Sequence, residues 1–402
     1  METQLDTPVA TSAQLLHTIA DYLTGPEART LPNFGVGTGK GGTVLFLCHY
    51  AAYTGNTQYY DQALEQLEAA LGEMNPQTYK SSYNSNYFQE LAELGNLLCY
   101  LGSQGHLDWD SELLLSKVDA LLEGRLQHHL ASKNLEIING ALSVGVYFLR
   151  RQRHSAVARR NLLLLLDALE ELHEGDEDTG YYWTCCVIQE PRVYTGISHG
   201  SAMLISFLAA VYEADVRPQE CARLMHYATK FLLRTRMDAN QNLSSFPLWQ
   251  GKEEPTSNLC LLYGDLGTAY AIIRAATILG NSYYLEEATQ IALRTTRRTA
   301  LADTYLYDAS LWYGTSGTYL LYAALYRLTR VEEFARAAQF WLEGLPRLAT
   351  HPNEYLGFSS YFFKQNPAAQ QGFNFGVTGI GLTLIQALSK GQYSVDDFIW
   401  LS

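Results

Sequence analysis

The chain has 402 residues, of which 47% are hydrophobic and 12% aromatic, and its formal net charge at pH 7 is −13. This composition excludes extended disorder, and a negative charge without any lysine- or arginine-rich stripe argues against nucleic acid as a partner. No apolar run reaches the roughly 18 to 20 residues of a membrane span, and the first residues lack the pattern of a secretory signal. We therefore expect a cytoplasmic protein with a single domain over residues 1–402.

A glycine-punctuated apolar motif recurs about every 50 to 65 residues, a spacing typical of repeat architectures. Each copy opens a segment that is apolar almost all round, as in residues 319–325, and such segments predict helices buried on every side. In chain order the seven copies span residues 39–46, 88–95, 139–146, 198–203, 263–269, 313–318 and 375–381.

Amphipathic, charge-bearing segments lie between the copies, with apolar residues at three- and four-residue intervals, as in residues 61–67, 113–121 and 332–338. Alternating buried and amphipathic helices hide their apolar faces by stacking sideways. Since no polar capping repeat is evident at either end, we predict an all-α fold that closes into an (α/α)7 double-ring toroid. Three irregular, aromatic-rich stretches, residues 180–195, 241–258 and 352–373, are predicted to be loops over one face of this ring, where function tends to lie.

The six cysteines lie mostly within helical apolar patterns, which predicts reduced core residues rather than a disulfide framework. The adjacent pair Cys185 and Cys186 lacks the Cys-x-x-Cys spacing of a zinc knuckle. We predict a structural role for this pair as well.

The series of motifs resembles the lanthipeptide cyclase (LanC-like) family. Residues 39–42 resemble the family's first repeat, residues 194–200 its His-Gly motif, and residues 261–267 its Trp-Cys-Tyr-Gly motif. Zinc-dependent members of that family close thioether rings by adding a peptide cysteine thiolate to a dehydroamino acid. The resemblance therefore implies a precursor peptide as substrate and a lanthipeptide dehydratase as a further partner.

The resemblance fails at the zinc ligands. The family holds zinc through the cysteine of the Trp-Cys-Tyr-Gly motif and a Cys-His pair in the next repeat, whereas this chain has Leu262 and the pair Trp312 and Tyr313 at those positions. Tetrahedral zinc needs soft sulfur or imidazole donors, so these side chains cannot replace the ligands. Cys260 lies two residues before Leu262 and supplies a single thiol, which is not enough for a zinc site. We predict no metal and no cofactor.

Two residues remain as catalytic candidates. His199 occupies the position of the family's catalytic histidine, and Glu136 falls where the family has an acidic residue that assists proton transfer. A histidine side chain ordinarily titrates near neutral pH, so His199 can deprotonate a thiol or protonate an enolate.

Five residues are predicted to bind substrate. Tyr263 and Asp265 match the family directly, although a core hydroxyl and a helix N-cap explain them equally well. Asn258 stands where members often carry arginine, and Trp312 with Tyr313 would shape the cavity.

Three functions stay open at this point. The first is a metal-independent cyclase, and the second is a catalytically inactive subunit that binds precursor peptide or a dehydratase. The third is a carbohydrate-active α/α toroid. Such an enzyme needs two carboxylates across the cavity, and the predicted mouths of the inner helices offer only Glu90, Glu136 and Asp265.

Overall fold

The computed structural model describes residues 11–26, 31–81, 85–106, 111–188, 190–251, 258–352 and 354–401. Within these ranges the regular secondary structure is almost entirely helix, and the one sheet is a short antiparallel pair, β1 (Glu174–Asp176) and β2 (Gly180–Tyr182). No helix in the described ranges is long and apolar enough to cross a membrane.

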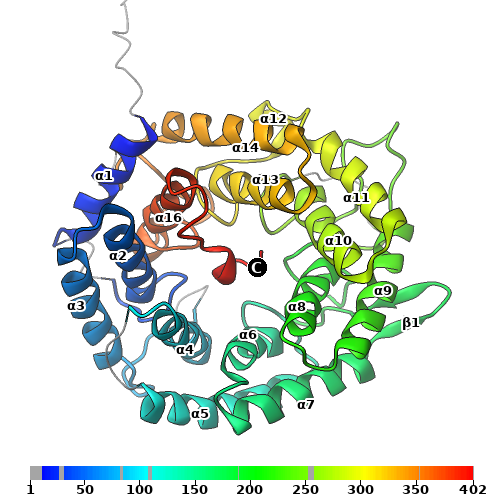
Figure 1. The fold of residues 1–402 in the computed structure, drawn as a ribbon, viewed down its shortest axis with the longest axis horizontal. Coiled ribbons are helices and arrows are strands. Elements are labelled where there is room, and N and C mark those ends of the chain that lie inside the picture. The colour runs from blue at the N-terminus through cyan, green and yellow to red at the C-terminus, as the bar shows by residue number, and fades with distance from the viewer. Residues whose placement is uncertain are drawn as a thin grey trace, which may run out of the picture.

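Seven helices form the inner layer of a ring (Figure 1). They are buried nearly all round, and in α10 every residue from Asp265 to Ala276 is buried. A helix without a polar face must be covered on all sides, so this layer requires a second one. In chain order the inner helices are α2 (Lys40–Thr54), α4 (Tyr87–Ser103), α6 (Ala141–Arg151), α8 (Ser201–Glu213), α10 (Asp265–Leu279), α13 (Thr315–Thr329) and α16 (Val377–Leu388).

Seven amphipathic helices supply the outer layer (Figure 1). In α7 the leucines at 162, 165, 166 and 169 are buried, whereas Arg160 and Asp167 on the opposite face are exposed. This spacing places one apolar stripe against the inner ring and leaves the charges in water. The outer helices are α1 (Ser12–Thr24), α3 (Gln58–Gly72), α5 (Glu112–Ala131), α7 (Ala156–Leu172), α9 (Pro218–Arg234), α11 (Ser282–Thr295) and α14 (Glu332–Gly344).

The ring closes by packing of its first helices on its last. Each inner helix packs on the next, from α2 and α4 through to α13 and α16, and α16 packs back on α2. The outer helix α1 precedes the first inner helix in the chain, yet it packs on α16 and completes the seventh hairpin (Figure 1). The predicted all-α (α/α)7 toroid is therefore confirmed.

Six of the seven glycine motifs form the same tight loop before an inner helix, with the glycine as N-cap. Before α13, the Thr315 N–H donates to the Asp308 carbonyl at 3.1 Å, and a Cβ on Gly314 would lie only 2.4 Å from that oxygen. Before α10, Gly264 has a φ of +93°, and a Cβ there would lie 1.9 Å from the Asn258 carbonyl. Only glycine fits such a close backbone approach.

The second motif differs from the prediction that each glycine opens a helix. Gly95 lies inside α4, whose N-cap is Asn86; the Asn86 side chain accepts a hydrogen bond from the Gln89 N–H. A Cβ on Gly95 would lie 2.6 Å from the ring of Tyr147 on α6. This glycine therefore serves close packing between two inner helices rather than a turn.

The segment after α16 turns into the middle of the ring (Figure 1). It contains the 3-10 helix η3 (Asp396–Phe398), and the Gln386 side-chain amide donates to Asp396 at 2.9 Å. The Tyr270 hydroxyl on α10 donates to the Leu401 carbonyl at 2.8 Å. Three further short helices lie between the main helices: α12 (Leu301–Thr304), η2 (Leu345–Leu348) and α15 (Pro367–Gln371).

Candidate functional site

The candidate site lies where the loops before α6, α8 and α10 meet, and His199 is its centre. His199 precedes the N-cap Gly200 and has a φ of +67°, a left-handed conformation that costs a non-glycine residue about 1 to 2 kcal/mol. The neighbouring Ser198 N–H donates to the Leu262 carbonyl at 2.8 Å, which ties this loop to the loop before α10. The surrounding hydrogen bonds thus hold the imidazole in a fixed orientation.

Both nitrogens of the His199 imidazole have polar partners. Nδ1 lies 2.6 Å from Oε2 of Glu136, and Nε2 lies 3.1 Å from the hydroxyl of Tyr263. A carboxylate only accepts hydrogen bonds, so it favours a proton on Nδ1 and leaves Nε2 free to accept from the tyrosine. Glu136 and His199 are 5% and 14% exposed, so the pair interacts where water screens it weakly.

Cys185 contributes a thiol to this site that the sequence did not lead us to expect. It follows β2, and its Sγ donates to Oε1 of Glu136 at 3.0 Å, while its neighbour Cys186 is exposed. The backbone of Cys185 pairs with Arg192 in a β-bridge, and the alternation along this extended segment turns one thiol inward and the other outward. We had predicted only a structural role for this pair.

Burial governs the protonation of two groups beside His199. Burial, together with the smaller effect of the Glu136 charge, raises the pKa of Cys185 to about 12. Burial likewise raises the pKa of Tyr263 to about 12. Both groups therefore keep their protons at neutral pH, so Tyr263 is a hydrogen-bond donor and the unmetallated Cys185 thiol is a poor nucleophile.

Aromatic and aliphatic side chains fill the positions at which the resembled family holds zinc. Leu262 is fully buried. The Tyr313 ring stacks between Tyr263, at a centroid distance of 6.2 Å, and Phe375, at 6.0 Å. Trp312 meets Phe375 edge to face at 5.1 Å. Zinc does not fit this hydrocarbon surface, because none of these side chains offers a sulfur or imidazole donor.

Cys260 does not restore that zinc site. Its thiol is buried and faces the Tyr263 carbonyl at 3.8 Å. Burial raises the pKa of this thiol to about 11, so it stays protonated. This is the environment of an inert core cysteine.

Asp265 and Asn258 lie in the same region but face the protein. The buried Asp265 carboxylate accepts hydrogen bonds from the Ser244 hydroxyl and from the N–H groups of Ser245 and Phe246. It thereby anchors the loop over the ring, and its predicted contact with substrate stays a prediction. The Asn258 carbonyl lies against the Cα of Gly264, and the Asn258 side chain is half-buried. The predicted role of Asn258 in binding substrate also stays a prediction.

Glu90, a candidate for carbohydrate chemistry, is also used by the fold. Its carboxylate accepts from the N–H groups of Phe34 and Gly35 and from the Tyr79 hydroxyl. Together with Asp265, two of the three candidate carboxylates are therefore committed to loops, which leaves Glu136 where a glycosidase would need two.

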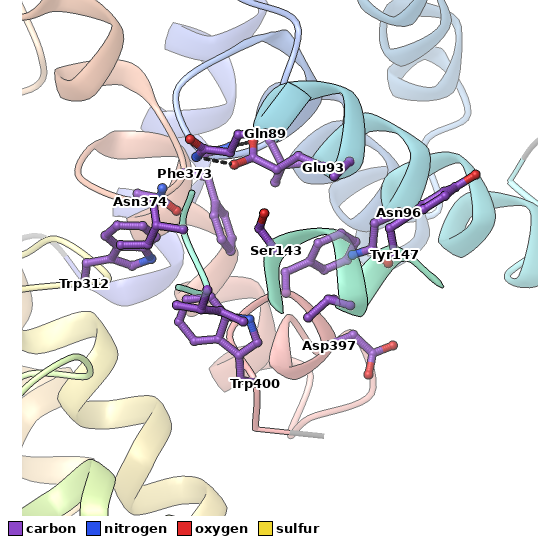
Figure 2. Close-up of a pocket in the computed structure, with 17 residues that line it drawn as sticks. Gln89, Glu93, Asn96, Ser143, Tyr147, Trp312, Phe373, Asn374, Asp397 and Trp400 are labelled. Carbon is purple, nitrogen blue, oxygen red and sulfur yellow. Dashed lines mark hydrogen bonds between the residues drawn. The ribbon is translucent and has the colours of Figure 1, made fainter. Parts of the chain in front are cut away.

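A cavity with room for about 80 Å³ of water-sized space lies in the middle of the ring, and Figure 2 shows residues that line it. Its polar wall includes Gln89 and Glu93, whose side chains hydrogen-bond at 3.0 Å, and its aromatic wall includes Trp312, Phe373 and Trp400. Burial raises the pKa of Glu93 to about 7. Trp312 lines this cavity and Tyr313 is not among its lining residues; the predicted contact of both with substrate stays a prediction.

Comparisons with known proteins agree with this fold. A family model described as "Lanthionine synthetase C-like protein" matches residues 33–399. The solved structure "Nisin cyclase" aligns with a TM-score of 0.75 at 15% identity, covering 97% of each chain. A glycosyl hydrolase of family 88 from Bacteroides vulgatus reaches a TM-score of only 0.43 at 14% identity, over 73% of this chain and 88% of its own. No curated protein sequence matches the chain.

Proposed function

Because the chain belongs to the lanthionine synthetase C-like family, we propose that it closes thioether rings in a dehydrated precursor peptide without a metal at the family's zinc position. The observation that carries this proposal is the hydrogen-bonded series Glu136, His199 and Tyr263. A carboxylate that orients an imidazole, whose other nitrogen faces a hydroxyl, is an arrangement suited to moving protons.

The proposed reaction joins a peptide cysteine to a dehydroalanine or dehydrobutyrine. His199 accepts the thiol proton at Nε2, displacing its contact with Tyr263, and the sulfur attacks the β-carbon of the alkene. The electron pair of the alkene moves to the carbonyl as an enolate, and the imidazolium then returns its proton to the α-carbon. One S–H bond and one C=C π bond are replaced by one C–S bond and one C–H bond. Glu136 stabilises the imidazolium between the two steps.

Loss of zinc slows such a reaction without preventing it. An unperturbed cysteine of pKa about 8.5 is only a few per cent thiolate at pH 7. Deprotonation therefore costs about 2 kcal/mol, or about 30-fold in rate, relative to a substrate held as thiolate. A fixed general base typically contributes about 100- to 10,000-fold, which is enough to offset that loss.

A second candidate is a subunit that binds the precursor peptide, or escorts a dehydratase, without chemistry. The stacked rings of Tyr263, Tyr313 and Phe375 favour it, because aromatic surfaces supply binding area without a reactive group.

Incubating the purified protein with a dehydrated, cysteine-containing peptide and measuring free thiols separates the two candidates. A cyclase consumes thiols faster than buffer does, and replacing His199 with asparagine removes most of the excess. If thiols disappear at the buffer rate while calorimetry detects bound peptide, the binding subunit is the correct function and the cyclase is not.

A further inference from the structure

Three side chains, His199 and two beside it, supply nitrogen, oxygen and sulfur donors to one point. One ligand atom each from Glu136, Cys185 and His199 lies within 4.8 Å of the other two. No other such group of three occurs in the described ranges. We propose that these residues form a site for a soft divalent metal ion, with Zn²⁺ as the best fit, and that its occupation switches off the acid-base chemistry of His199.

The donor set matches zinc chemistry. Zinc is held by cysteine sulfur, imidazole nitrogen and carboxylate oxygen, and sites with three protein ligands keep a fourth position open. Glu136, Cys185 and His199 line one small cavity together with Trp183 and Met203, so there is space beside the three donors for a fourth ligand such as water. Glu136 and Cys185 are both buried, which limits competition from water.

The required movement is small. Nδ1 of His199 lies 2.6 Å and Sγ of Cys185 lies 3.0 Å from oxygens of Glu136, which are hydrogen-bond lengths. A tetrahedral ion with bonds of about 2.0 to 2.3 Å separates its donors by about 3.3 to 3.6 Å. These two contacts lengthen by less than 1 Å, and the widest separation among the three donors, at most 4.8 Å, shortens by at most about 1.5 Å; side-chain rotation in the loops accommodates both changes.

The site differs from the family's zinc position. Leu262, Trp312 and Tyr313 occupy that position here and offer no suitable donors. The prediction of no metal weighs Cys185 and Cys186 only as a possible zinc knuckle, because the sequence does not show that Cys185 faces Glu136.

Metal binding changes the chemistry of each ligand. The Cys185 thiol loses one proton to solvent and binds as a thiolate. His199 binds through Nδ1, which fixes the remaining proton on Nε2, toward Tyr263. The imidazole then has no lone pair for a substrate thiol, and Glu136 no longer stabilises an imidazolium. This second half of the proposal rests on the proposed cyclase function, whereas metal binding itself does not.

Cobalt(II) titration of the full chain, freed of metal with a chelator, tests the binding. We expect one equivalent to bind with a thiolate-to-cobalt absorption band in the near ultraviolet. Replacing Cys185 with serine or alanine should abolish the band and weaken binding about 100-fold or more. The matched replacements Cys186→Ser, next to it and exposed, and Cys260→Ser, buried nearby, should preserve the band.

A missing band in the wild type, or one that survives both Cys185 variants, would overturn the site. Near-ultraviolet circular dichroism identifies any variant that misfolds, and in that case Glu136→Gln provides the second test: it keeps all six thiols but should weaken cobalt binding at least 10-fold.

Thiol-consumption assays with Zn²⁺ added test the switch. We expect one equivalent of Zn²⁺ to reduce the wild-type rate at least 10-fold and to leave the rate of Cys185→Ser unaffected, whatever that rate is. Stoichiometric Zn²⁺ binding without inhibition would overturn the switch. A wild type that is inactive with and without metal would refute the proposed cyclase function instead, and the cobalt titration would still decide the binding site.

Discussion

Replacing Glu136 with glutamine removes one buried negative charge while preserving the side-chain length. The Oε2 to Nδ1 distance is 2.6 Å and Glu136 is 5% exposed, so the lost interaction is a charge-assisted hydrogen bond in a poorly screened site. Such bonds contribute about 1.5 to 3 kcal/mol. If this energy stabilises the imidazolium during thiol addition, kcat should fall by about 10- to 150-fold.

The assay is the initial rate of free-thiol loss from a dehydrated peptide at pH 7 in the presence of a chelator, with peptide affinity measured by calorimetry. We expect kcat to fall and the affinity for peptide to stay within about twofold, since Glu136 is inside the protein. Glu93→Gln is the matched control, because it removes a carboxylate that does not contact His199. A Glu136→Gln variant that folds normally and keeps the wild-type kcat would refute this reasoning.

Three further predictions concern catalysis and stability. Tyr263→Phe deletes a neutral hydrogen bond to Nε2 that the substrate thiol has to displace, so it should leave kcat unchanged or raise it by up to about 13-fold; a loss as large as that of Glu136→Gln in the same assay would contradict the mechanism. Burial raises the pKa of Glu93 from 4.5 to about 7, so its protonated form stabilises the fold fully below pH 4.5 and this stability is lost as the pH rises through 7. The glutamine of Glu93→Gln cannot ionise. The free energy of unfolding of this variant, measured by denaturant titration, should therefore rise relative to that of the wild type between pH 5 and pH 8, by at most about 3 kcal/mol. A difference that does not change with pH would contradict the raised pKa of Glu93. Gly264→Ala should destabilise the protein by about 2 kcal/mol or more, because its Cβ would lie 1.9 Å from the Asn258 carbonyl; an unchanged denaturation midpoint would contradict this.

Much of the fold can be predicted from the sequence because the repeat has a local cause. The glycine motifs recur since six of the seven inner helices are entered through a loop in which a carbonyl approaches the glycine too closely for a Cβ, as at Gly314. The pairing of α1 with α16 has no such signature, because α1 is an ordinary amphipathic helix and its partner lies more than 350 residues away. Gly95 shows the limit of the motif, since a glycine that permits helix packing has the same sequence appearance as one that permits a turn.

The site is predictable only where a motif fixes the loop. His199, Glu136 and Tyr263 each precede or begin a glycine-capped helix, and the structure brings these three together. Cys185 lies in an irregular loop 49 residues from Glu136, and neither periodicity nor resemblance indicates which of two adjacent thiols points inward. The use of Asp265 as a loop anchor likewise depends on the conformation of residues 244–246, which their sequence does not determine.

The most direct test of the central claim is the rate of thioether formation by the chelator-treated wild type compared with His199→Asn, using mass spectrometry to count unreacted thiols in a dehydrated peptide. Metal-free chemistry at His199 predicts a wild-type rate well above that of buffer, at least 100-fold above that of the variant, and not increased by Zn²⁺. A wild type that is active only after Zn²⁺ is added, or a His199→Asn variant as active as the wild type, would contradict it.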